Sequence, residues 1–338
     1  MRLSRREFLK LAASVGAAAT VNLASLEKAL AGNGDPRVIW LQGQSCSGCS
    51  VSLLNSVNMM TVDDLLLHGI NLEYHSTLIA AAGDLALSGL AGVHPSPAEL
   101  SAFGSAWLQS GTGLDFDLDQ NGVVNFVDFA KLAAQGYVLV VEGSIPVGAA
   151  GRFCHVGGEM TMLDAFDRFS DKATHILAIG ACAAYGGIPG ANPNPTEALS
   201  VQETLDYIGR SKPVVNIPGC PAHPDWFVGT VSYLLANGKP PSLDTVGRPM
   251  TYFAEQVHTN CPLKGKKVPR AQELGEYGCL EGLGCKGKIT SADCPMRKWN
   301  SGGPGQNGVN WCVGARNPCQ GCTEPGFPDA MTPFYTLG

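Results

Sequence analysis

The chain has 338 residues, of which 45% are hydrophobic, and this is enough for two domains and a sizeable core. Its formal net charge is −6 and no long basic stripe is visible, so the charge does not favour nucleic acid as a partner. The 12 cysteines make up about 4% of the residues, well below the roughly 8–10% of a disulfide scaffold. Their spacing therefore has to decide their role.

Residues 1–31 are typical of a targeting segment. A twin arginine, Arg5 and Arg6, precedes a weakly apolar run, and residues 29–31 supply a small-x-small cleavage signal. The pattern predicts a twin-arginine signal peptide, which exports proteins already folded, to the periplasm; an amphipathic N-terminal helix is the alternative. No other stretch approaches about 18 uninterrupted apolar residues, so no transmembrane helix is expected in the mature chain.

Between about residues 36 and 240, apolar runs of strand length alternate with segments of helical periodicity. This alternation indicates an α/β fold with a parallel sheet covered on both faces, and such sheets carry ligands beyond the carboxyl ends of their strands. The predicted strands are 37–42, 70–75, 137–143, 174–180 and 213–219, and the predicted helices include 160–170 and 201–209.

The segment DLDQNGVVNFVD at 117–128 interrupts this alternation and fits the spacing of a calcium-binding loop, with Gly122 at the turn. Helical patterns flank it. Aspartate rather than glutamate at the last position weakens the match, and no second loop is present, so an Asp/Asn-rich turn is the alternative. Loops of this extracellular kind bind at roughly 0.1–1 mM. The candidate calcium ligands are Asp117, Asp119, Asn121, the Val123 carbonyl, Asn125 and Asp128.

Four cysteines directly follow predicted strands. Cys46 and Cys49 follow the first strand, Cys182 follows 174–180, and Cys220 follows 213–219. Because loops at one edge of a sheet lie together, we expect these four, called the sheet-edge set, within reach of a single metal centre. The alternative is four separate buried or paired cysteines. Flanking glycines would let backbone approach a bulky group: Gly43, Gly48, Gly180, Gly186, Gly187 and Gly219.

From about residue 245 onwards the periodicity gives way to Gly, Pro, Lys and Cys. Little apolar surface is available to offset chain entropy, so metal or cluster ligation is expected to stabilise this part. It holds two further groups of four soft ligands. The first, called the Cys294 set, is Cys294, Cys312, Cys319 and Cys322. The second, called the His258 set, is His258, Cys261, Cys279 and Cys285.

Zinc also accepts four cysteines, or three cysteines with one histidine, so structural zinc sites are an alternative. Cys220, Cys261 and Cys294 are each followed by proline, as at the end of bacterial ferredoxin motifs. Three such sites, one of them over the edge of a parallel sheet, favour a row of iron–sulfur clusters that passes single electrons. No nucleophile and base pairing stands out elsewhere in the sequence.

These stretches together resemble the small, electron-transfer subunit of nickel–iron hydrogenases. The resemblance runs from about residue 36 to 338, except for the insertion near 88–130, and it covers every candidate cysteine and histidine ligand. It is carried by WLQGQSCSGCSVSLLN, YHSTLIAAAG, VVEGSIP, GACAAYGGI, PNPT, IPGCPAHP, VHTNCP, GCLEGLGCKG, DCP and NPCQGCTEPGFPDAMTPFY.

The resemblance implies a flavodoxin-like domain at 32–244, with the inserted segment 88–130, and a mostly irregular cluster-binding domain at 245–338. It implies a proximal [4Fe–4S] cluster on the sheet-edge set, nearest the nickel–iron site of a partner large subunit. The Cys294 set would bind the medial cluster, and the His258 set the distal [4Fe–4S] cluster where electrons leave. Glu142 lies in a family motif beside the proximal cluster, either as a proton-handling group or as a carboxylate that caps a loop.

Two departures from the family pattern are informative. Oxygen-tolerant members carry two additional cysteines around the proximal cluster, and this sequence has Gly48 and Gly187 there, which implies an ordinary cluster and oxygen sensitivity. Cys312 stands where many members have proline and a three-iron medial cluster. A fourth thiolate implies a complete [4Fe–4S] cluster, and this feature looks most like the nickel–iron–selenium branch.

The sequence thus predicts the small subunit of a periplasmic heterodimeric hydrogenase, with a low-potential cytochrome c as an expected electron acceptor. Lys264, Lys266, Lys267 and Arg270 either line the docking face for that acceptor or solvate a loop. Membrane-anchored members often carry a further C-terminal apolar helix, whereas this sequence ends at TPFYTLG, so a soluble or peripherally attached enzyme is expected. The alternatives are a cluster subunit of another respiratory complex and an exported interaction protein stabilised by zinc or calcium.

Cys154 belongs to none of the three sets and is expected to be a buried thiol. The other histidines, including His75, His155 and His223, are expected to be core groups or to support a site rather than to bind metal.

Overall fold

The computed structural model describes residues 37–57, 59–78, 136–157, 160–265, 267–299 and 310–336. The predicted signal peptide at 1–31 and the predicted calcium loop at 117–128 lie outside these residues. Within the described ranges, none of the helices has the length and apolar character needed to span a bilayer.

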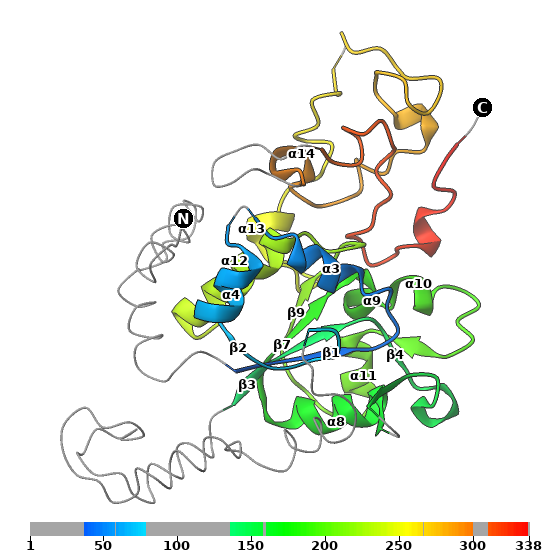
Figure 1. Ribbon diagram of the computed structural model, residues 1–338. Helices are drawn as coiled ribbons and strands as arrows, with labels where there is room; N and C mark the ends of the chain where they lie inside the picture. Colours follow the sequence, from blue (N-terminus) through cyan, green and yellow to red (C-terminus); the bar gives the residue numbers. More distant parts are fainter. Residues whose placement is uncertain are drawn as a thin grey trace, which may run out of the picture.

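A five-stranded parallel sheet forms the centre of the first part of the chain (Figure 1). Its order is β2-β1-β3-β7-β9, the order typical of flavodoxin-like folds. The predicted parallel sheet is confirmed, and every predicted strand overlaps an observed one. The strands are β1 (Arg37–Gln42), β2 (Asn71–His75), β3 (Tyr137–Glu142), β7 (Ala173–Ile179) and β9 (Val214–Ile217).

Helices cover both faces of this sheet, as Figure 1 shows. One face packs against α3 (Gly48–Leu54), α4 (Val62–His68) and α12 (Pro224–Asn237). The other packs against α8 (Met162–Lys172) and α11 (Val201–Tyr207). Alternate residues of β1 go to opposite faces, so Trp40 lies in the first layer and Leu41 in the second. Burying each such large side chain contributes about 1.5–3 kcal/mol.

Local signals explain where the covering helices begin. Thr161 caps α8, because its Oγ1 accepts a hydrogen bond from Asp164 N (3.0 Å) while Asp164 bonds back to Thr161 N. Ser200 and Glu203 form the same reciprocal cap on α11. His223 caps α12 through its Nδ1, which accepts from Asp225 N at 3.1 Å. These caps fix the helices that follow β6 (Met160–Thr161), β8 (Ala198–Leu199) and β9.

Short elements complete the connections between the strands. They are β4 (Ile145–Pro146), which pairs with β8, the 3₁₀ helix η1 (Gly148–Gly151), β5 (His155–Gly157), which pairs with β6, α9 (Gly180–Tyr185) and α10 (Gly187–Gly190).

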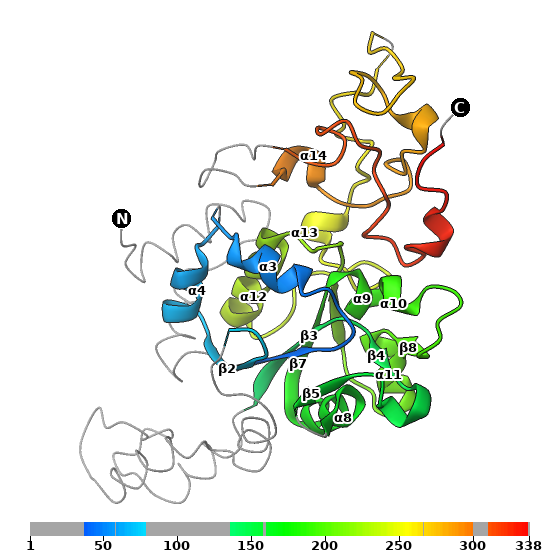
Figure 2. The same ribbon diagram turned by 45° about the vertical axis from the view of Figure 1, so that its right-hand side comes forward.

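The C-terminal part is mostly irregular, as predicted. Its regular elements among the described residues are single turns: α13 (Met250–Phe253), η2 (Glu281–Leu283), α14 (Cys294–Arg297) and η3 (Asp329–Met331). Figures 1 and 2 agree that this part lies beyond the end of the sheet that carries α3, α9 and α13. Its apolar residues, such as Trp311 and Val313, join the same core as Trp40 and Trp226.

Candidate functional site

The sheet-edge set comes from connections that leave the carboxyl end of the sheet. Cys46 follows β1, and Cys49 lies in the first turn of α3. Cys182 lies in the first turn of α9, directly after β7, and Cys220 follows β9. Cys49 and Cys182 are therefore in helices rather than in the predicted loops. The turns after β7 and β9 are joined by a hydrogen bond from Ala181 N to Gly219 O (2.8 Å).

The four thiols of this set influence one another electrostatically. The pKa of Cys182 is raised to about 11, chiefly by burial and in smaller part by the neighbouring Cys220 and Cys46. Burial likewise raises the pKa of Cys49 well above its usual range, with added effects of Glu142, Cys182 and Cys220. Raised pKa values keep these thiols protonated at pH 7 unless a bound cation stabilises the thiolates, which are the metal-binding form. The structure thus places the four thiols of the predicted set near one another.

Glycines leave the room that these sulfurs need. A Cβ on Gly180, which has φ +85°, would lie 2.5 Å from Cys49 Sγ. A Cβ on Gly48 would lie 3.0 Å from Cys46 Sγ, and one on Gly187 would lie 2.7 Å from the Cα of Cys182. Side chains at these three positions would displace the thiols or their backbone, so the glycines form a cradle around the set.

Glu142 ends β3 and is almost fully buried, with its carboxylate directed at the start of α3. Its Oε1 accepts hydrogen bonds from the backbone N of Cys49 (3.0 Å) and of Ser50 (3.3 Å). Its Oε2 accepts from Trp40 Nε1 (3.1 Å), Gln42 Nε2 (3.0 Å) and Ser50 Oγ. All five partners are donors, so Glu142 fixes the backbone of a predicted ligand and anchors the first turn of α3.

His75, at the end of β2, continues this network. Its Nδ1 accepts from Thr77 N (3.1 Å), which leaves the Nε2 proton to donate to Ser50 Oγ at 3.2 Å. Burial lowers the pKa of His75 to about 4, although Glu142 raises it, so the imidazole is neutral at pH 7. His75, which was expected to be a core group or to support a site, is thus fully buried and bonded to Ser50 beside Glu142.

The Cys294 set is also brought together. Cys294 opens α14, and burial raises the pKa of its thiol well above the usual range. The thiol of Cys322, the Asp293 carboxylate and the thiols of Cys319 and Cys312 raise it further, so all three other cysteines lie near Cys294. Cys319 Sγ lies 3.6 Å from Thr290 Oγ1, to which it donates. Cys312 is exposed and lies near Cys285 of the His258 set as well as near Cys294.

The His258 set lines one small, partly open cavity, with all four of its residues on the wall. Burial raises the pKa of Cys261, and Cys285 and Cys279 raise it further. The remaining walls include Lys264, Glu281 and Lys288.

The three sets form a row with the Cys294 set in the middle. The backbone N–H of Cys220, in the sheet-edge set, lies beside Cys322 and lowers the pKa of that thiol. At the other end, Cys319 N donates to Cys285 Sγ, in the His258 set, at 3.4 Å. Each outer set therefore touches the middle set through one backbone N–H beside a sulfur.

The donor chemistry of all three sites fits iron–sulfur clusters. Two sites offer four thiols, the third offers three thiols and an imidazole, and glycines leave space at the first. Among the described residues, no three or more His, Cys, Asp and Glu side chains are arranged to hold a single metal ion.

The burial of two remaining residues differs from what was expected. His155 on β5 is exposed, so of its two expected roles, a core group or a support for a site, the core role is wrong. Cys154 is half-buried, at the margin of the core that contains Phe166, and burial raises the pKa of its thiol. His223 is buried, and its Nε2 donates to Lys298 O at 2.7 Å.

Both parts of the chain match known protein families. Residues 46–234 match the family described as NADH ubiquinone oxidoreductase, 20 Kd subunit. Residues 253–335 match the family described as the C-terminal part of the NiFe/NiFeSe hydrogenase small subunit. The first match is shared with other respiratory complexes, and the second defines the class as a hydrogenase subunit.

Relatives that match over almost the full length of the chain are also hydrogenase small subunits. The periplasmic [NiFeSe] hydrogenase small subunit of Desulfomicrobium baculatum is 36% identical, with 99% of each chain covered. The periplasmic [NiFe] hydrogenase small subunit of Solidesulfovibrio fructosivorans is 35% identical over 99% of this chain and 94% of its own length. The solved [NiFeSe] hydrogenase from Desulfovibrio vulgaris Hildenborough matches with a TM-score of 0.69 at 38% identity, covering 89% of this chain and 98% of that chain.

The chain belongs to the family of [NiFe] and [NiFeSe] hydrogenase small subunits. Such a subunit is a component of an oxidoreductase whose catalytic site lies in the partner large subunit, so the predicted family and enzyme class are confirmed.

Proposed function

We propose that this chain conducts electrons between the hydrogen-splitting site of a large subunit and an external acceptor, using three [4Fe–4S] clusters. The observation that carries the proposal is the row of three four-donor sets, joined at Cys220–Cys322 and at Cys319–Cys285. When bound, the clusters would supply one-electron redox chemistry. The chain's own residues hold the sulfur donors and order the three sites.

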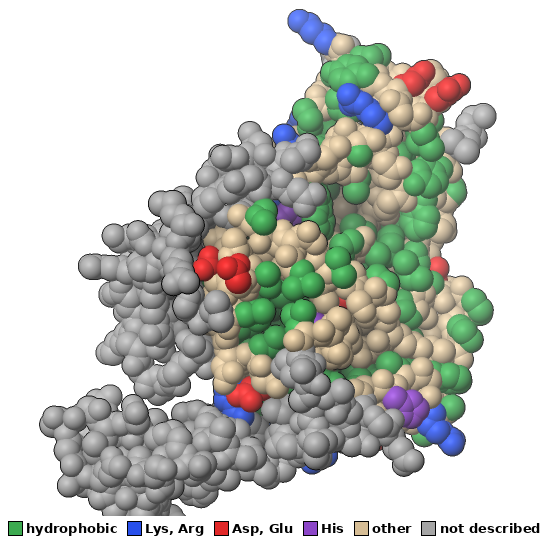
Figure 3. All heavy atoms as spheres, viewed as in Figure 1, with side chains coloured by type: hydrophobic (Ala, Val, Ile, Leu, Met, Phe, Trp, Pro, Cys, Tyr) green, Lys and Arg blue, Asp and Glu red, His purple; other side chains and the backbone are tan. Residues whose placement is uncertain are grey.

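The sheet-edge set faces the proposed large subunit. Cys46 and Cys220 are exposed, and so are the apolar side chains of Val51, Leu54 and Val57 on and just after α3. Figure 3 shows hydrophobic side chains gathered on the face of the molecule that carries α3 and α4. Exposed apolar residues next to exposed ligands are the features of a surface that becomes buried against another protein.

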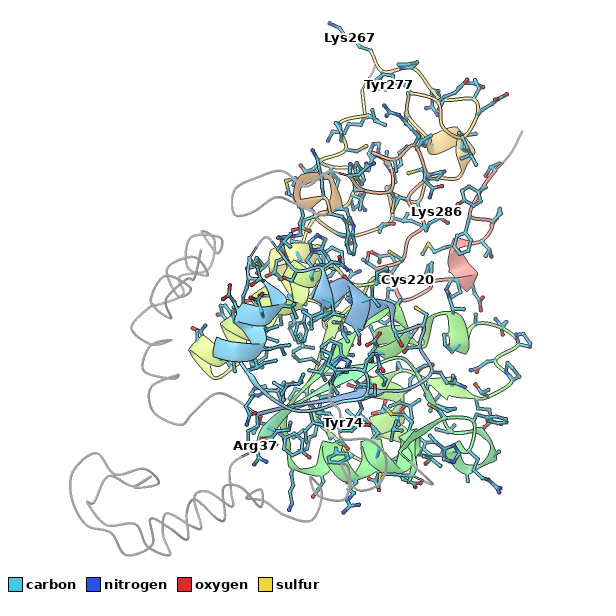
Figure 4. The ribbon with its side chains drawn as sticks, in the orientation of Figure 1. Arg37, Tyr74, Cys220, Lys267, Tyr277 and Lys286 are labelled. Carbon is cyan, nitrogen blue, oxygen red and sulfur yellow. The ribbon has the colours of Figure 1, made fainter. Side chains whose placement is uncertain are left out.

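The His258 set faces the proposed electron acceptor. Figure 4 shows Lys267 at the tip of the C-terminal part farthest from the sheet, well away from Cys220. Lys264, Lys267 and Arg270 are exposed there, while Lys266 lies outside the described residues. Arg270 and Lys288 both pair with Glu281, which leaves Lys264 and Lys267 as the better candidates for docking a low-potential cytochrome c.

Cys312 and the glycines refine the type of enzyme that we propose. Because Cys312 lies near Cys294 together with Cys319 and Cys322, we assign it as the fourth ligand of a medial [4Fe–4S] cluster, as in the nickel–iron–selenium branch. A cysteine at Gly187 would clash with Cys182, so we propose an ordinary proximal cluster and an oxygen-sensitive enzyme.

We further propose periplasmic location after twin-arginine export, and weak calcium binding at 117–128. The support is the sequence pattern of both segments and the periplasmic location in the names of the relatives. Saturable calcium binding that Asp117→Asn abolishes would support the loop, and unchanged binding would remove it.

Hydrogen-dependent reduction of a redox dye tests the proposed function. The chain copurified with its large subunit is expected to reduce the dye under hydrogen, and the isolated chain is not, because the catalytic site lies in the partner. Sequencing of the partner would also establish whether selenocysteine is present in it. A complex that contains the metal centres but transfers no electrons from hydrogen would contradict the proposal.

A further inference from the structure

Two largely buried arginines, Arg248 and Arg297, bind the segments on either side of the Cys294 set, and each is also connected to the sheet domain. We propose that Arg248 and Arg297 are positioning residues, whose ion pairs hold the Cys294 set against the sheet-edge set. The inference rests on the proposed function, because it assigns to these side chains the spacing between two redox sites.

Arg248 binds the two residues directly after Cys322, Thr323 and Glu324. Its side chain is 8% exposed, its Nε donates to Asp244 Oδ2 (2.7 Å), and its NH1 donates to Glu324 Oε1 (2.9 Å). The same NH1 donates to the backbone carbonyl of Thr323 at 2.9 Å. The planar guanidinium thus donates hydrogen bonds to one carboxylate in its own turn, that of Asp244. It also donates to two acceptors in the segment after Cys322, the Thr323 carbonyl and the Glu324 carboxylate.

The turn that carries Arg248 is anchored on β9, the strand that leads to Cys220. Asn216 of β9 donates through its backbone N to Gly247 O (2.8 Å) and through Nδ2 to Val246 O (2.8 Å). The contacts therefore close a ring from β9 through the turn to Arg248, then to Glu324 and Cys322, and back to Cys220. Arg248 is the side chain that links the turn held on β9 to the segment after Cys322.

Glu324, the partner of Arg248, also binds the segment that leads to Cys294. Its Oε1 also accepts from Ser291 N, and Thr323 Oγ1 donates to Ser291 O at 3.0 Å. Ser291 precedes Cys294 by three residues. One arginine–carboxylate pair thereby holds the backbone on both sides of the set.

Arg297 forms the second bridge. Its NH1 donates to Asp225 Oδ2 (2.9 Å) in the first turn of α12, and its NH2 donates to Asp293 Oδ2 (2.6 Å), directly before Cys294. Trp226 Nε1 donates to Asp293 Oδ1 at 2.8 Å, and the guanidinium lies over the ring of Tyr252. Since α12 begins four residues after Cys220, this bridge fixes Cys294 relative to the same sheet-edge thiol.

Removal of one charge from such a buried pair leaves the other uncompensated, so the effect should reach the nearby redox site. Loss of the Arg248 charge makes the addition of an electron to the Cys294 set less favourable. Loss of the Glu324 charge makes it more favourable. The two substitutions should therefore shift the reduction potential of this centre in opposite directions. General destabilisation of the protein would not produce opposite shifts.

The test is a redox titration of the purified heterodimer, followed by electron paramagnetic resonance, on Arg248→Gln, Arg248→Lys and Glu324→Gln. Arg248→Gln should make one-electron reduction of the medial centre about tenfold less favourable, a shift of about 59 mV to lower potential. Glu324→Gln should shift it upward. Arg248→Lys, which keeps the charge, should restore the potential but still alter the magnetic coupling between the medial and proximal centres.

Arg210→Gln is the matched control, because Arg210 pairs at the surface with Asp167 and Asp171 and should leave all three centres unchanged. Unchanged medial potential and coupling in both Arg248→Gln and Glu324→Gln would overturn the inference, as would equal shifts at all three centres. If the Arg248→Gln heterodimer does not assemble, the shift in medial potential caused by Glu324→Gln tests the inference alone. A wild-type chain without three iron–sulfur signals would instead contradict the proposed function itself.

Discussion

Gly180→Ala should abolish iron binding at the sheet-edge set, so that the chain retains about 8 of the about 12 iron atoms expected from three [4Fe–4S] clusters. The added Cβ would lie 2.5 Å from Cys49 Sγ, at a φ of +85° that disfavours any side chain. The backbone has little freedom to move away, because Ala181 N is bonded to Gly219 O at 2.8 Å. Iron analysis of the purified chain and loss of hydrogen-dependent dye reduction by the complex are the measurements.

Gly209→Ala is the control for the backbone alone. Gly209 also has a positive φ, +70°, but a Cβ there meets nothing within 4 Å. Its replacement should cost about 1–2 kcal/mol of stability and leave the iron content unchanged. A Gly180→Ala chain with full iron content would show that the thiol of Cys49 is not confined as the structure indicates.

Cys312→Pro should convert the centre at the Cys294 set to a three-iron form, with about 11 iron atoms per chain in place of about 12. The reason is that Cys312 lies near Cys294, as Cys319 and Cys322 do, so its removal leaves three thiols at the proposed medial site. The carbonyl of Cys312, which accepts from Asn317 N at 3.0 Å, is kept by proline. The measurement is the appearance of a three-iron signal in the electron paramagnetic resonance spectrum.

Cys154→Ser is the matched control, since Cys154 packs against the core beneath the opposite face of the sheet and belongs to no set. Its iron content and spectrum should equal those of the unchanged chain. An unaltered medial signal in Cys312→Pro would refute the assignment of Cys312 as a ligand.

The sheet could be predicted from the sequence because its strands are buried on both faces. Runs such as YVLVVEG at 137–143 and THILAIG at 174–180 are continuously apolar, and they become neighbouring parallel strands. The placement of cysteines after strand ends then followed from the geometry of parallel sheets. Cys49 and Cys182 proved to lie in helices because α3 and α9 begin almost as soon as their strands end.

The C-terminal sets could be grouped from spacing and from family resemblance, but their contacts could not. The sequence pattern does not predict that Cys319 N donates to Cys285 Sγ, or that the backbone N–H of Cys220 lies beside the Cys322 thiol. Both contacts depend on how an irregular segment lies against the sheet domain, which is a tertiary property.

Buried polar partners were the other part that the sequence did not reveal. Arg248 and Arg297 are charged residues in polar stretches, where solvent exposure is the ordinary expectation. Their partners Glu324 and Asp225 lie 76 and 72 residues away in the chain. His75 was expected to support a site, but its link to Glu142 through Ser50 required the pairing of β2 with β1. His155 was expected to be a core group or to support a site, and the core role is wrong, because His155 is exposed on the short β5–β6 hairpin.

The count of iron and acid-labile sulfide in the purified chain tests the central claim most directly. Three sites with four ligands each predict about 12 iron and about 12 sulfide atoms per chain, with no stoichiometric zinc. A chain that contains zinc without iron, or iron for fewer than three four-iron clusters in a fully loaded preparation, would contradict the proposed relay.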